Sequence, residues 1–241
     1  MASNDKTPKK GTKSKKTKDQ GKKVLILLSG GPDSATLAKM AEQELKETGG
    51  TLSALFLKTG HPKDKKELEA ANRVANIVGA RLEVVDISDA IRALGGKLPT
   101  IHSEASIMRF GNSIVMSLAM AYAFEAGHDE LMIGLHKDDA LESLEYTRPY
   151  MDRIQDLADY AYEDSPKIKT PFLDIDKVGV FTLGKKIGVD YSVTWSCIRG
   201  EEKHCGTCGA CRARRRAFNL VGIEDKTDYA VEPVALDSVA G

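Results

Sequence analysis

The sequence predicts an α/β protein with a doubly wound parallel sheet and a small cysteine-rich appendage near its C-terminal end. Three observations lead to this prediction. Short apolar runs alternate with helical patterns, which is typical of a parallel sheet covered by helices on both faces. The first apolar run ends in a glycine-rich turn that opens a helix. All four cysteines fall between positions 197 and 211.

The first third of the chain alternates strand and helix patterns. Positions 24–28 are uniformly apolar, which predicts a strand buried on both faces. A helix is expected over 34–47, because a glycine pair stops the pattern there. A second strand is expected over 51–57. A helix over 65–78, with apolar residues at helical spacing, then leads to a third strand over 81–86.

The remaining chain is less regular. Positions 89–109 contain a glycine pair and a proline, so we expect an irregular segment that covers part of the site. Positions 113–125 are apolar nearly all round, which predicts an interior helix. A fourth strand is expected over 130–134, and the polar segment 136–148 after it is expected to be a functional loop. Further helices are expected over 149–163 and 177–187, separated by an extended segment at 170–172.

Composition places the chain among globular proteins. A length of 241 residues, of which 41% are hydrophobic and 29% charged, suits one sizeable α/β domain plus an appendage. No apolar stretch approaches the roughly 18–20 residues of a membrane span, so no membrane partner is expected. The N-terminus lacks the hydrophobic segment of a secretory signal, which favours a cytoplasmic protein.

The formal net charge of zero hides an asymmetry. Residues 1–23 hold nine of the 35 basic residues and two of the 35 acidic ones, leaving 26 basic and 33 acidic residues elsewhere. The lysine-rich tail over 1–22 is expected to be disordered, either as a solubilising extension or as a contact arm for a polyanion. The acidic remainder argues against nucleic-acid binding as the main activity.

The run S-G-G-P-D-S at positions 29–34 is the most informative motif. A strand followed by glycines and a helix aims backbone N–H groups at one point, which suits a phosphate group. The run lacks the lysine of the ATPase loop G-x-x-x-x-G-K-[ST]. Such a loop suits enzymes that split ATP between the α and β phosphates and activate a carboxylate as an adenylate. An ordinary strand–turn–helix junction with Asp33 or Ser34 as N-cap is the alternative.

The cysteines follow the spacing C-x7-C-x2-C-x2-C, at Cys197, Cys205, Cys208 and Cys211. Two-residue spacers let successive thiolates converge on one ion, and four thiolates describe a closed, structural zinc site. An iron–sulfur cluster is the alternative, but the x3-C-P element of ferredoxins is absent. His204 adjoins a ligand and is expected to be a bystander.

These motifs together resemble the 7-cyano-7-deazaguanine synthase family of PP-loop ATP pyrophosphatases. The family shows SGGxDS near one end and TWSC followed by E-K-x-C-G-x-C-x-x-C near the other, as found here at 29–34, 194–197 and 202–211. The resemblance extends from about Lys22 to Tyr229. It implies a PP-loop, adenine nucleotide α-hydrolase-like domain over 23–190, a zinc-binding region over 191–230 and a flexible tail over 231–241.

The family resemblance also implies an activity. The family uses ATP and Mg²⁺ to join 7-carboxy-7-deazaguanine to ammonia, first as the amide and then as 7-cyano-7-deazaguanine, on the route to queuosine. Cofactors are therefore ATP, Mg²⁺ and Zn²⁺, and a homodimer is possible. Catalytic roles are implied for Asp33 and Ser34. ATP binding is implied for Leu28, Ser29, Gly30, Gly31, Pro32, Asp33, Ser34, Ala35 and Thr36, and substrate binding for Arg109, Asn112, Asp139 and Arg148.

Three segments depart from the family pattern. Positions 108–112 read M-R-F-G-N where the family shows V-P-G-R-N, and 140–147 replace the family's S-G-Y-P-D-C. A third departure lies at 60–63, which read G-H-P-K where the family shows G-Q-R-H. ATP activation is therefore better supported than the substrate. One alternative is a relative that joins a deazaguanine to a protein amine in antiviral defence. Others are a PP-loop tRNA-modifying enzyme and a nucleotide-binding scaffold without turnover.

Overall fold

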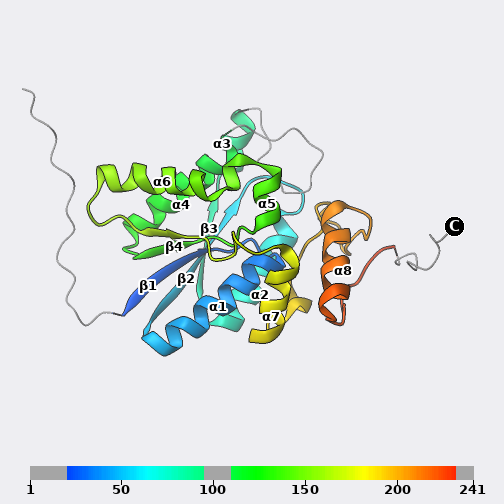
Figure 1. Cartoon of the computed structure of the whole chain (residues 1–241). Coiled ribbons are helices and arrows are strands. Elements are labelled where there is room, and N and C mark those ends of the chain that lie inside the picture. The colour runs from blue at the N-terminus through cyan, green and yellow to red at the C-terminus, as the bar shows by residue number, and fades with distance from the viewer. Residues whose placement is uncertain (1–20, 95–109, 232–241) are drawn as a thin grey trace, which may run out of the picture.

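The computed structural model describes residues 21–94 and 110–231, which form a five-stranded sheet covered by helices (Figure 1). The strand order is β3-β2-β1-β4-β5 and every neighbouring pair is parallel. This confirms the predicted doubly wound parallel sheet. The strands are β1 (Lys22–Leu27), β2 (Gly50–Lys58), β3 (Arg81–Asp86), β4 (Glu130–Met132) and β5 (Lys167–Lys169).

The helices form a layer on each face of the sheet (Figure 1). Helices α1, α2 and α7 cover one face, α4 and α6 cover the other, and α8 packs against α7 at the far end. The helices are α1 (Pro32–Thr48), α2 (Asp64–Val78), α3 (Ser88–Ala93), α4 (Gly111–Glu125), α5 (Lys137–Glu142), α6 (Arg148–Ala161), α7 (Lys177–Ile187) and α8 (Gly209–Val221). Two 3-10 turns are η1 (Leu144–Tyr146) and η2 (Tyr191–Val193).

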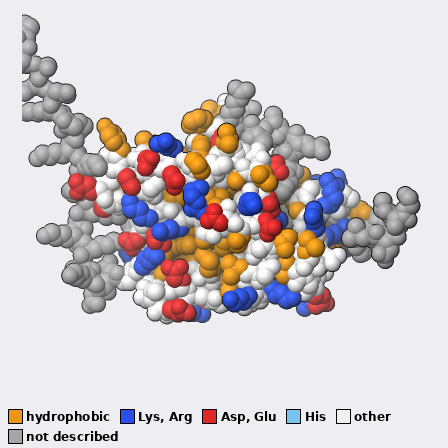
Figure 2. Space-filling view, in the orientation of Figure 1, with side chains coloured by type: hydrophobic (Ala, Val, Ile, Leu, Met, Phe, Trp, Pro, Cys, Tyr) orange, Lys and Arg blue, Asp and Glu red, His pale blue; other side chains and the backbone are white. Residues whose placement is uncertain are grey.

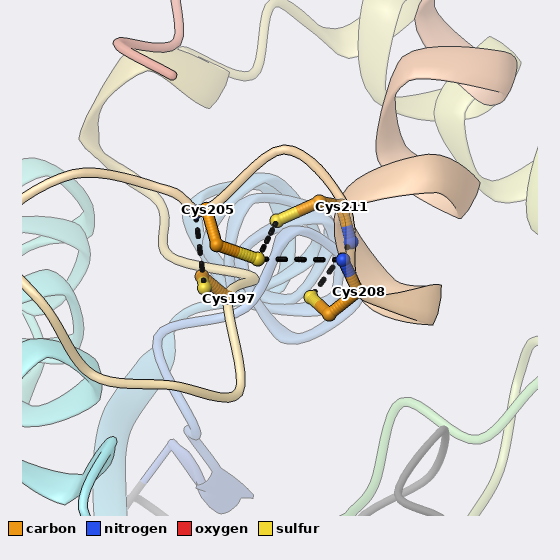
Figure 3. A group of neighbouring side chains, drawn as sticks. All are labelled: Cys197, Cys205, Cys208 and Cys211. Atoms are coloured by element: carbon orange, nitrogen blue, oxygen red, sulfur yellow. Dashed lines mark hydrogen bonds between the residues drawn. The ribbon is translucent and has the colours of Figure 1, made fainter. Parts of the chain in front are cut away.

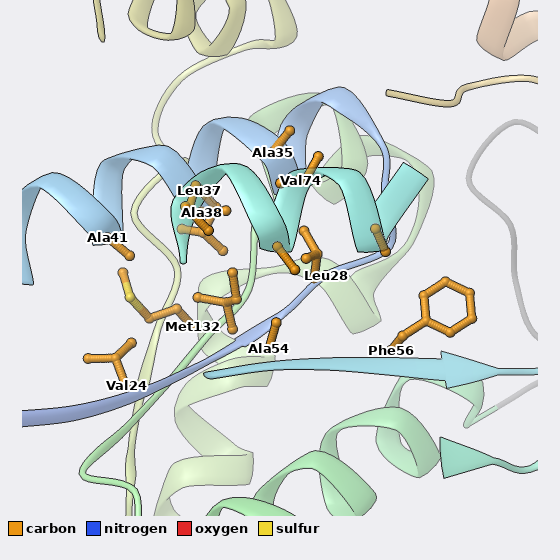
Figure 4. Close-up of a cluster of buried hydrophobic side chains, with 14 of the residues drawn as sticks. Val24, Leu28, Ala35, Leu37, Ala38, Ala41, Ala54, Phe56, Val74 and Met132 are labelled. Carbon is orange, nitrogen blue, oxygen red and sulfur yellow. The ribbon is translucent and has the colours of Figure 1, made fainter. Parts of the chain in front are cut away.

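Strand β1 is buried on both faces, because alternate side chains of its apolar run pack into two different hydrophobic clusters. Val24 and Ile26 belong to the cluster beneath α1 and α2, which Figure 4 shows from within. Leu25, whose side chain points the opposite way, packs with Met116 of α4. An unbroken apolar strand is what a central parallel strand requires.

The order of the strands places a ligand site. From β1 the chain winds through β2 to β3, and then crosses to β4 on the other side of β1. Ligands of open α/β sheets bind outside the carboxyl ends of the strands where the winding reverses. The crevice between β1 and β4 is that point, and the glycine-rich turn follows β1 directly.

Several sequence-based expectations were wrong. The segment 136–148 contains α5 and η1 rather than a continuous loop. Positions 170–172, expected to be extended, enter a turn directly after a short strand, β5. Strand β4 ends at Met132 instead of position 134. Helix α4 buries one face, while Leu118 on the other is 36% exposed. Three-residue strands and one-and-a-half-turn helices are too short to carry a readable periodicity.

The segment 89–109 was expected to be irregular, but its first residues belong to helix α3 (Ser88–Ala93). Its remainder over 95–109, and the expected tails before residue 21 and after residue 231, lie outside the described residues. Among the helices of the described ranges, none combines the length and the apolar character needed to cross a bilayer.

Candidate active site and four-cysteine centre

The glycine-rich turn between β1 and α1 has the local geometry of an anion site. Gly31 is the N-cap of α1 and Pro32 occupies the first turn, so the helix starts where the sequence motif predicts. The Ser29 hydroxyl accepts a hydrogen bond from the Gly31 N–H at 3.3 Å and lies 3.2 Å from the Ser34 hydroxyl. Backbone N–H groups and two hydroxyls therefore converge at the start of α1.

Gly30 is required at its position for two reasons. Its φ is +77°, which disfavours any residue with a Cβ. A Cβ would also collide with the Glu67 carbonyl oxygen and lie 2.7 Å from the Ala71 nitrogen. The turn is therefore pressed against helix α2.

We expect Gly30→Ala to lower the free energy of unfolding by about 2 kcal/mol or more and to weaken ATP binding, since the turn must move away from α2. Gly49→Ala is a matched control, because Gly49 has a similar φ of +74° with nothing within 4 Å of the added Cβ. Chemical denaturation and ATP titration of both variants measure the difference. Equal effects in the two variants would refute a role for the close approach to α2.

A cavity of about 330 Å³ opens at this turn. It is bounded by the turn, by the carboxyl ends of β1, β2 and β4, and by the starts of α2, α4 and α7. Its polar lining residues are Ser29, Asp33, Ser34, Thr59, Lys63, Asp64, Glu67, Asn112, Asp139, Tyr146, Lys177 and Ser196. The site thus lies at the reversal of strand order.

Lysines from other elements supply the positive charge that the turn lacks. Lys177, the first residue of α7, places its ammonium 2.7 Å from the Asp33 carboxylate and 3.4 Å from Nε2 of His136. Lys63, just before α2, pairs with Glu67 at 2.6 Å. Sequence reasoning missed both, because a phosphate motif is sought within one loop and these lysines come from distant segments.

Six of the nine residues predicted to bind ATP line the cavity: Leu28, Ser29, Gly31, Pro32, Asp33 and Ser34. Within the described part of the chain, the other three are not lining residues. Gly30 lies against α2, and Ala35 belongs to the hydrophobic core beneath α1. Thr36 is buried and its hydroxyl lies 2.8 Å from the Tyr191 hydroxyl.

The residues predicted to bind the substrate are placed differently from one another. Asn112 and Asp139 line the cavity. Arg148, at the start of α6, forms a salt bridge of 2.8 Å with Asp174 and is not a lining residue of the cavity among the described residues. Arg109 lies outside the described residues.

The segments 108–112 and 140–147, which depart from the family pattern, contact each other. The Glu145 carboxylate accepts hydrogen bonds from the backbone N–H groups of Phe110 at 2.9 Å and Asn112 at 2.8 Å. A carboxylate there satisfies the first N–H groups of α4 and complements the helix dipole. Glu145 therefore stabilises the start of α4.

The four cysteines meet in a buried cluster, shown in Figure 3. Cys197 and Cys205 come from the segment between η2 and α8, and Cys208 and Cys211 come from the start of α8. Their sulfurs all lie within 4.8 Å of one another. A cluster of four cysteine sulfurs this close together could hold a metal ion that takes thiolate ligands. Backbone N–H groups of Cys205, Cys208 and Cys211 donate to sulfurs of the cluster, which favours thiolates.

His204 is not part of this cluster, as expected, but it has a structural role. Burial lowers the pKa of His204 to about 3, with the Arg214 guanidinium adding to the effect, so the imidazole is neutral. Its Nε2 accepts a hydrogen bond of 3.0 Å from the Ser196 N–H, and its ring lies 4.0 Å from the Trp195 ring. It thereby fixes the segment that enters the cluster.

The cysteine region is joined directly to the glycine-rich turn. The Trp195 N–H donates to the Gly30 carbonyl at 2.9 Å. The buried Arg214 guanidinium donates to the Tyr191 carbonyl at 2.7 Å and to the Thr194 hydroxyl at 2.8 Å. A metal that organises the cysteines therefore also holds one wall of the cavity.

Charged side chains are mixed over the face drawn in Figure 2, where Lys and Arg side chains gather over the end that carries α8. Exposed residues of α8 include Arg212 and Arg216. The body of this face shows both signs of charge interspersed.

Comparison with known proteins gives a consistent result. A model of the family "Queuosine biosynthesis protein QueC" matches residues 23–222. The chain is 33% identical over 219 residues to 7-cyano-7-deazaguanine synthase 1 of Colwellia psychrerythraea, covering 86% of this chain and 98% of that protein. The 7-cyano-7-deazaguanine synthase of Psychromonas ingrahamii is 33% identical over 222 residues, with 86% and 98% coverage.

Solved structures share the fold. The U34-tRNA thiolase NcsA from Methanococcus maripaludis, solved with its [4Fe-4S] cluster, matches with a TM-score of 0.54 and 21% identity over 86% of this chain and 74% of that chain. The NMN synthetase from Francisella tularensis matches with a TM-score of 0.50 and 19% identity, covering 90% and 82%. These likenesses concern the fold and confirm the predicted PP-loop type of sheet.

Proposed function

The chain belongs to the queuosine biosynthesis protein QueC family, and we propose that it converts 7-carboxy-7-deazaguanine and ammonia into 7-cyano-7-deazaguanine at the expense of ATP. One observation carries the proposal: the cavity at the carboxyl edge of the sheet, where the glycine-rich turn, Asp33 and Lys177 meet. Relatives matched over 98% of their length bear the name of this synthase.

We assign the ATP phosphates to the turn and the start of α1. Ser29, Gly31 and Ser34 offer hydroxyl and N–H donors there, and the helix N-terminus favours negative charge. Adenine would lie against the end of β2, where residues 55–57 line the cavity. Ala35 and Thr36 support this site from behind, since Thr36 bonds to Pro32 and Tyr191.

The chemistry proposed is transfer of AMP to a carboxylate. A carboxylate oxygen of the substrate attacks the α-phosphorus of ATP, and pyrophosphate leaves. The protein positions the two reactants and stabilises the charge that shifts to the departing phosphates. Lys177 lies where it can do the latter, and its bond to Asp33 fixes its ammonium beside the turn. Mg²⁺ bound with ATP would supply further positive charge, and Asp33 is the residue that would hold it.

We propose zinc as the ion of the four-cysteine cluster. Four sulfurs without a carboxylate or a histidine ligand give a closed site, which has no open position for catalysis. Its role is to fold the region of residues 194–211 against the turn. Elemental analysis of purified protein tests the assignment: one zinc per chain is expected, and iron with acid-labile sulfide would establish an iron–sulfur cluster instead.

The activity is tested by incubating the protein with ATP, Mg²⁺ and 7-carboxy-7-deazaguanine, with and without ammonium, followed by mass spectrometry. We expect AMP, and the nitrile when ammonium is present. AMP with a product that stops at the adenylate or amide would make a protein amine the leading acceptor. No AMP under any condition would overturn the proposal.

The same preparation shows by sedimentation whether the expected homodimer forms. A cytoplasmic location is proposed because it supplies ATP and keeps thiols reduced.

A further inference from the structure

Four carboxylates line the cavity, and three of them are engaged with other groups. Asp33 pairs with Lys177 at 2.7 Å, and Glu67 pairs with Lys63 at 2.6 Å. Asp64 accepts hydrogen bonds from the N–H groups of the loop after β2, at 2.7 Å from Thr59 and 2.7 Å from Gly60. Burial raises the pKa of Glu67 although Lys63 opposes this, so Glu67 differs from Asp139 in its ion pair with a lysine. In these three residues the carboxylate oxygens are engaged by a cation or by several N–H groups.

The fourth carboxylate, Asp139, has a different environment. It is the third residue of α5, it is 3% exposed, and it lines the cavity. Its Oδ2 accepts one hydrogen bond of 2.9 Å from the His136 N–H, and its Oδ1 lies 3.5 Å from Nε2 of His136. In the described part of the chain, Asp139 forms no salt bridge with a lysine or arginine.

The capping bond fixes how Asp139 is presented. Oδ2 accepts a hydrogen bond from the N–H of His136, the N-cap residue of α5. This bond restricts rotation of the carboxyl group and keeps it at the cavity wall. The Tyr146 side chain lies beside it at the same wall, contributed by η1. A fixed, desolvated carboxylate without a cationic partner is suited to remove a proton from a bound substrate.

We propose that Asp139 is the catalytic base of the second half of the reaction, in which the amide is converted into the nitrile. This rests on the proposed function and adds a role to a residue that the family resemblance associates with substrate binding alone. In this proposal the Asp139 carboxylate contacts the reacting nitrogen of the bound substrate, and the His136 N–H positions that carboxylate.

The proposed step balances as follows. The amide oxygen attacks the α-phosphorus of a second ATP and pyrophosphate leaves, while one proton of the amide nitrogen passes to water, giving a neutral imidate adenylate. Asp139 then takes the remaining N–H proton. The electron pair of that N–H bond forms the third C–N bond, the C–O bond breaks, and AMP leaves with its electron pair. No oxidant or reductant is involved.

The first half of the reaction has less need of this base. When ammonia attacks the acyl adenylate, the adduct nitrogen is cationic and gives its proton readily to water. The imidate nitrogen is neutral and is a much weaker acid. Loss of the base should therefore affect nitrile formation far more than amide formation, and this difference separates a base from a group that binds the substrate.

The charges around Asp139 support a proton acceptor that works near neutral pH. Burial raises the pKa of Asp139 to about 7, the bond from the His136 N–H opposes this, and the Asp33 carboxylate adds to it. The other groups that face it are Lys177 from α7, which lowers the pKa, and Asp138 from α5, which raises it. His136 and the Tyr146 phenol complete the titratable groups around it.

The test uses Asp139→Asn in the full-length protein, with synthetic 7-amido-7-deazaguanine as substrate. The asparagine oxygen still accepts the His136 N–H bond, so the fold of α5 should survive. We expect nitrile formation to fall by about 100-fold or more, while ATP–pyrophosphate exchange with the acid changes by less than about fivefold. The amide should accumulate when the reaction starts from the acid. Glu142→Gln, exposed on the same helix, is the control and should behave as the unmodified chain.

The pH dependence gives a second readout. With the unmodified chain, nitrile formation from the amide should rise between about pH 6 and pH 8, as Asp139 loses its proton. The Asp139→Asn variant should lack this rise. If Asp139→Asn lowered amide formation and nitrile formation equally, or kept the pH profile of the unmodified chain, the proposal would be overturned and Asp139 would be a binding residue. If the unmodified chain makes no nitrile at all, the proposed function itself fails first.

Discussion

Lys177→Met is expected to lower adenylate formation by about 10²–10³-fold without unfolding the protein. Lys177 lines the cavity and its ammonium lies 2.7 Å from the carboxylate of Asp33 in the glycine-rich turn. Its removal takes away a positive charge aimed at the phosphates and leaves the Asp33 carboxylate to repel them. ATP–pyrophosphate exchange in the presence of 7-carboxy-7-deazaguanine measures the loss.

The control for this variant lies on the same helix. Lys186→Met removes an exposed lysine from the last turn of α7 and should leave exchange unchanged. Combining Lys177→Met with Asp33→Asn should cost less than the sum of the two single effects, because the unpaired carboxylate is removed as well. Exchange within about threefold of normal in Lys177→Met would show that this lysine does not act on the phosphates.

Cys211→Ser is expected to have the largest effect on stability. It removes one of four sulfurs that converge within 4.8 Å, so the metal should be lost or bound far more weakly. Structural zinc supports folding directly, and we expect the free energy of unfolding to fall by about 3 kcal/mol or more. Zinc content and thermal unfolding, measured on the same sample, give both quantities.

The same substitution should weaken ATP binding at a distance. The cysteine region holds the Trp195 N–H on the Gly30 carbonyl at 2.9 Å, so a released region frees one side of the turn. Asn219→Ser, an exposed change on α8, serves as the control for both measurements. A Cys211→Ser protein that keeps full zinc content and normal ATP affinity would contradict the coupling between the two sites.

Much of the fold could be predicted because its long elements carry periodic patterns. The strand over 81–86 and the helix over 177–187 coincide with β3 and α7, and the predicted starts of α1, α2, α4 and α6 differ from the observed ones by one or two residues. Helix α8 was not predicted, and the remaining errors concern short elements. Strand β5 has three residues and α5 has six, and each is held by neighbours: β5 pairs with β4, and the start of α5 is capped by His136 and Asp139.

The candidate site was predictable where one segment makes it. The turn after β1 shows its glycines and its helix start in six consecutive residues, and the cysteine cluster shows its spacing within fifteen. Arg148 forms a salt bridge with Asp174 and, among the described residues, is not part of the cavity wall, so its role in substrate binding stays a prediction. The contacts of a lone arginine at the start of a helix leave no local pattern in the sequence.

The sequence by itself determined the class of fold, the position of the glycine-rich turn and the presence of a four-cysteine cluster, because each depends on residues close together in the chain. The tertiary structure decided which groups share the cavity. Asp33 and Lys177 are 144 residues apart, and His136 and Asp139 join them from the segment after β4. Such meetings follow from strand order and helix packing, which act through contacts between distant segments and leave no periodicity in the sequence.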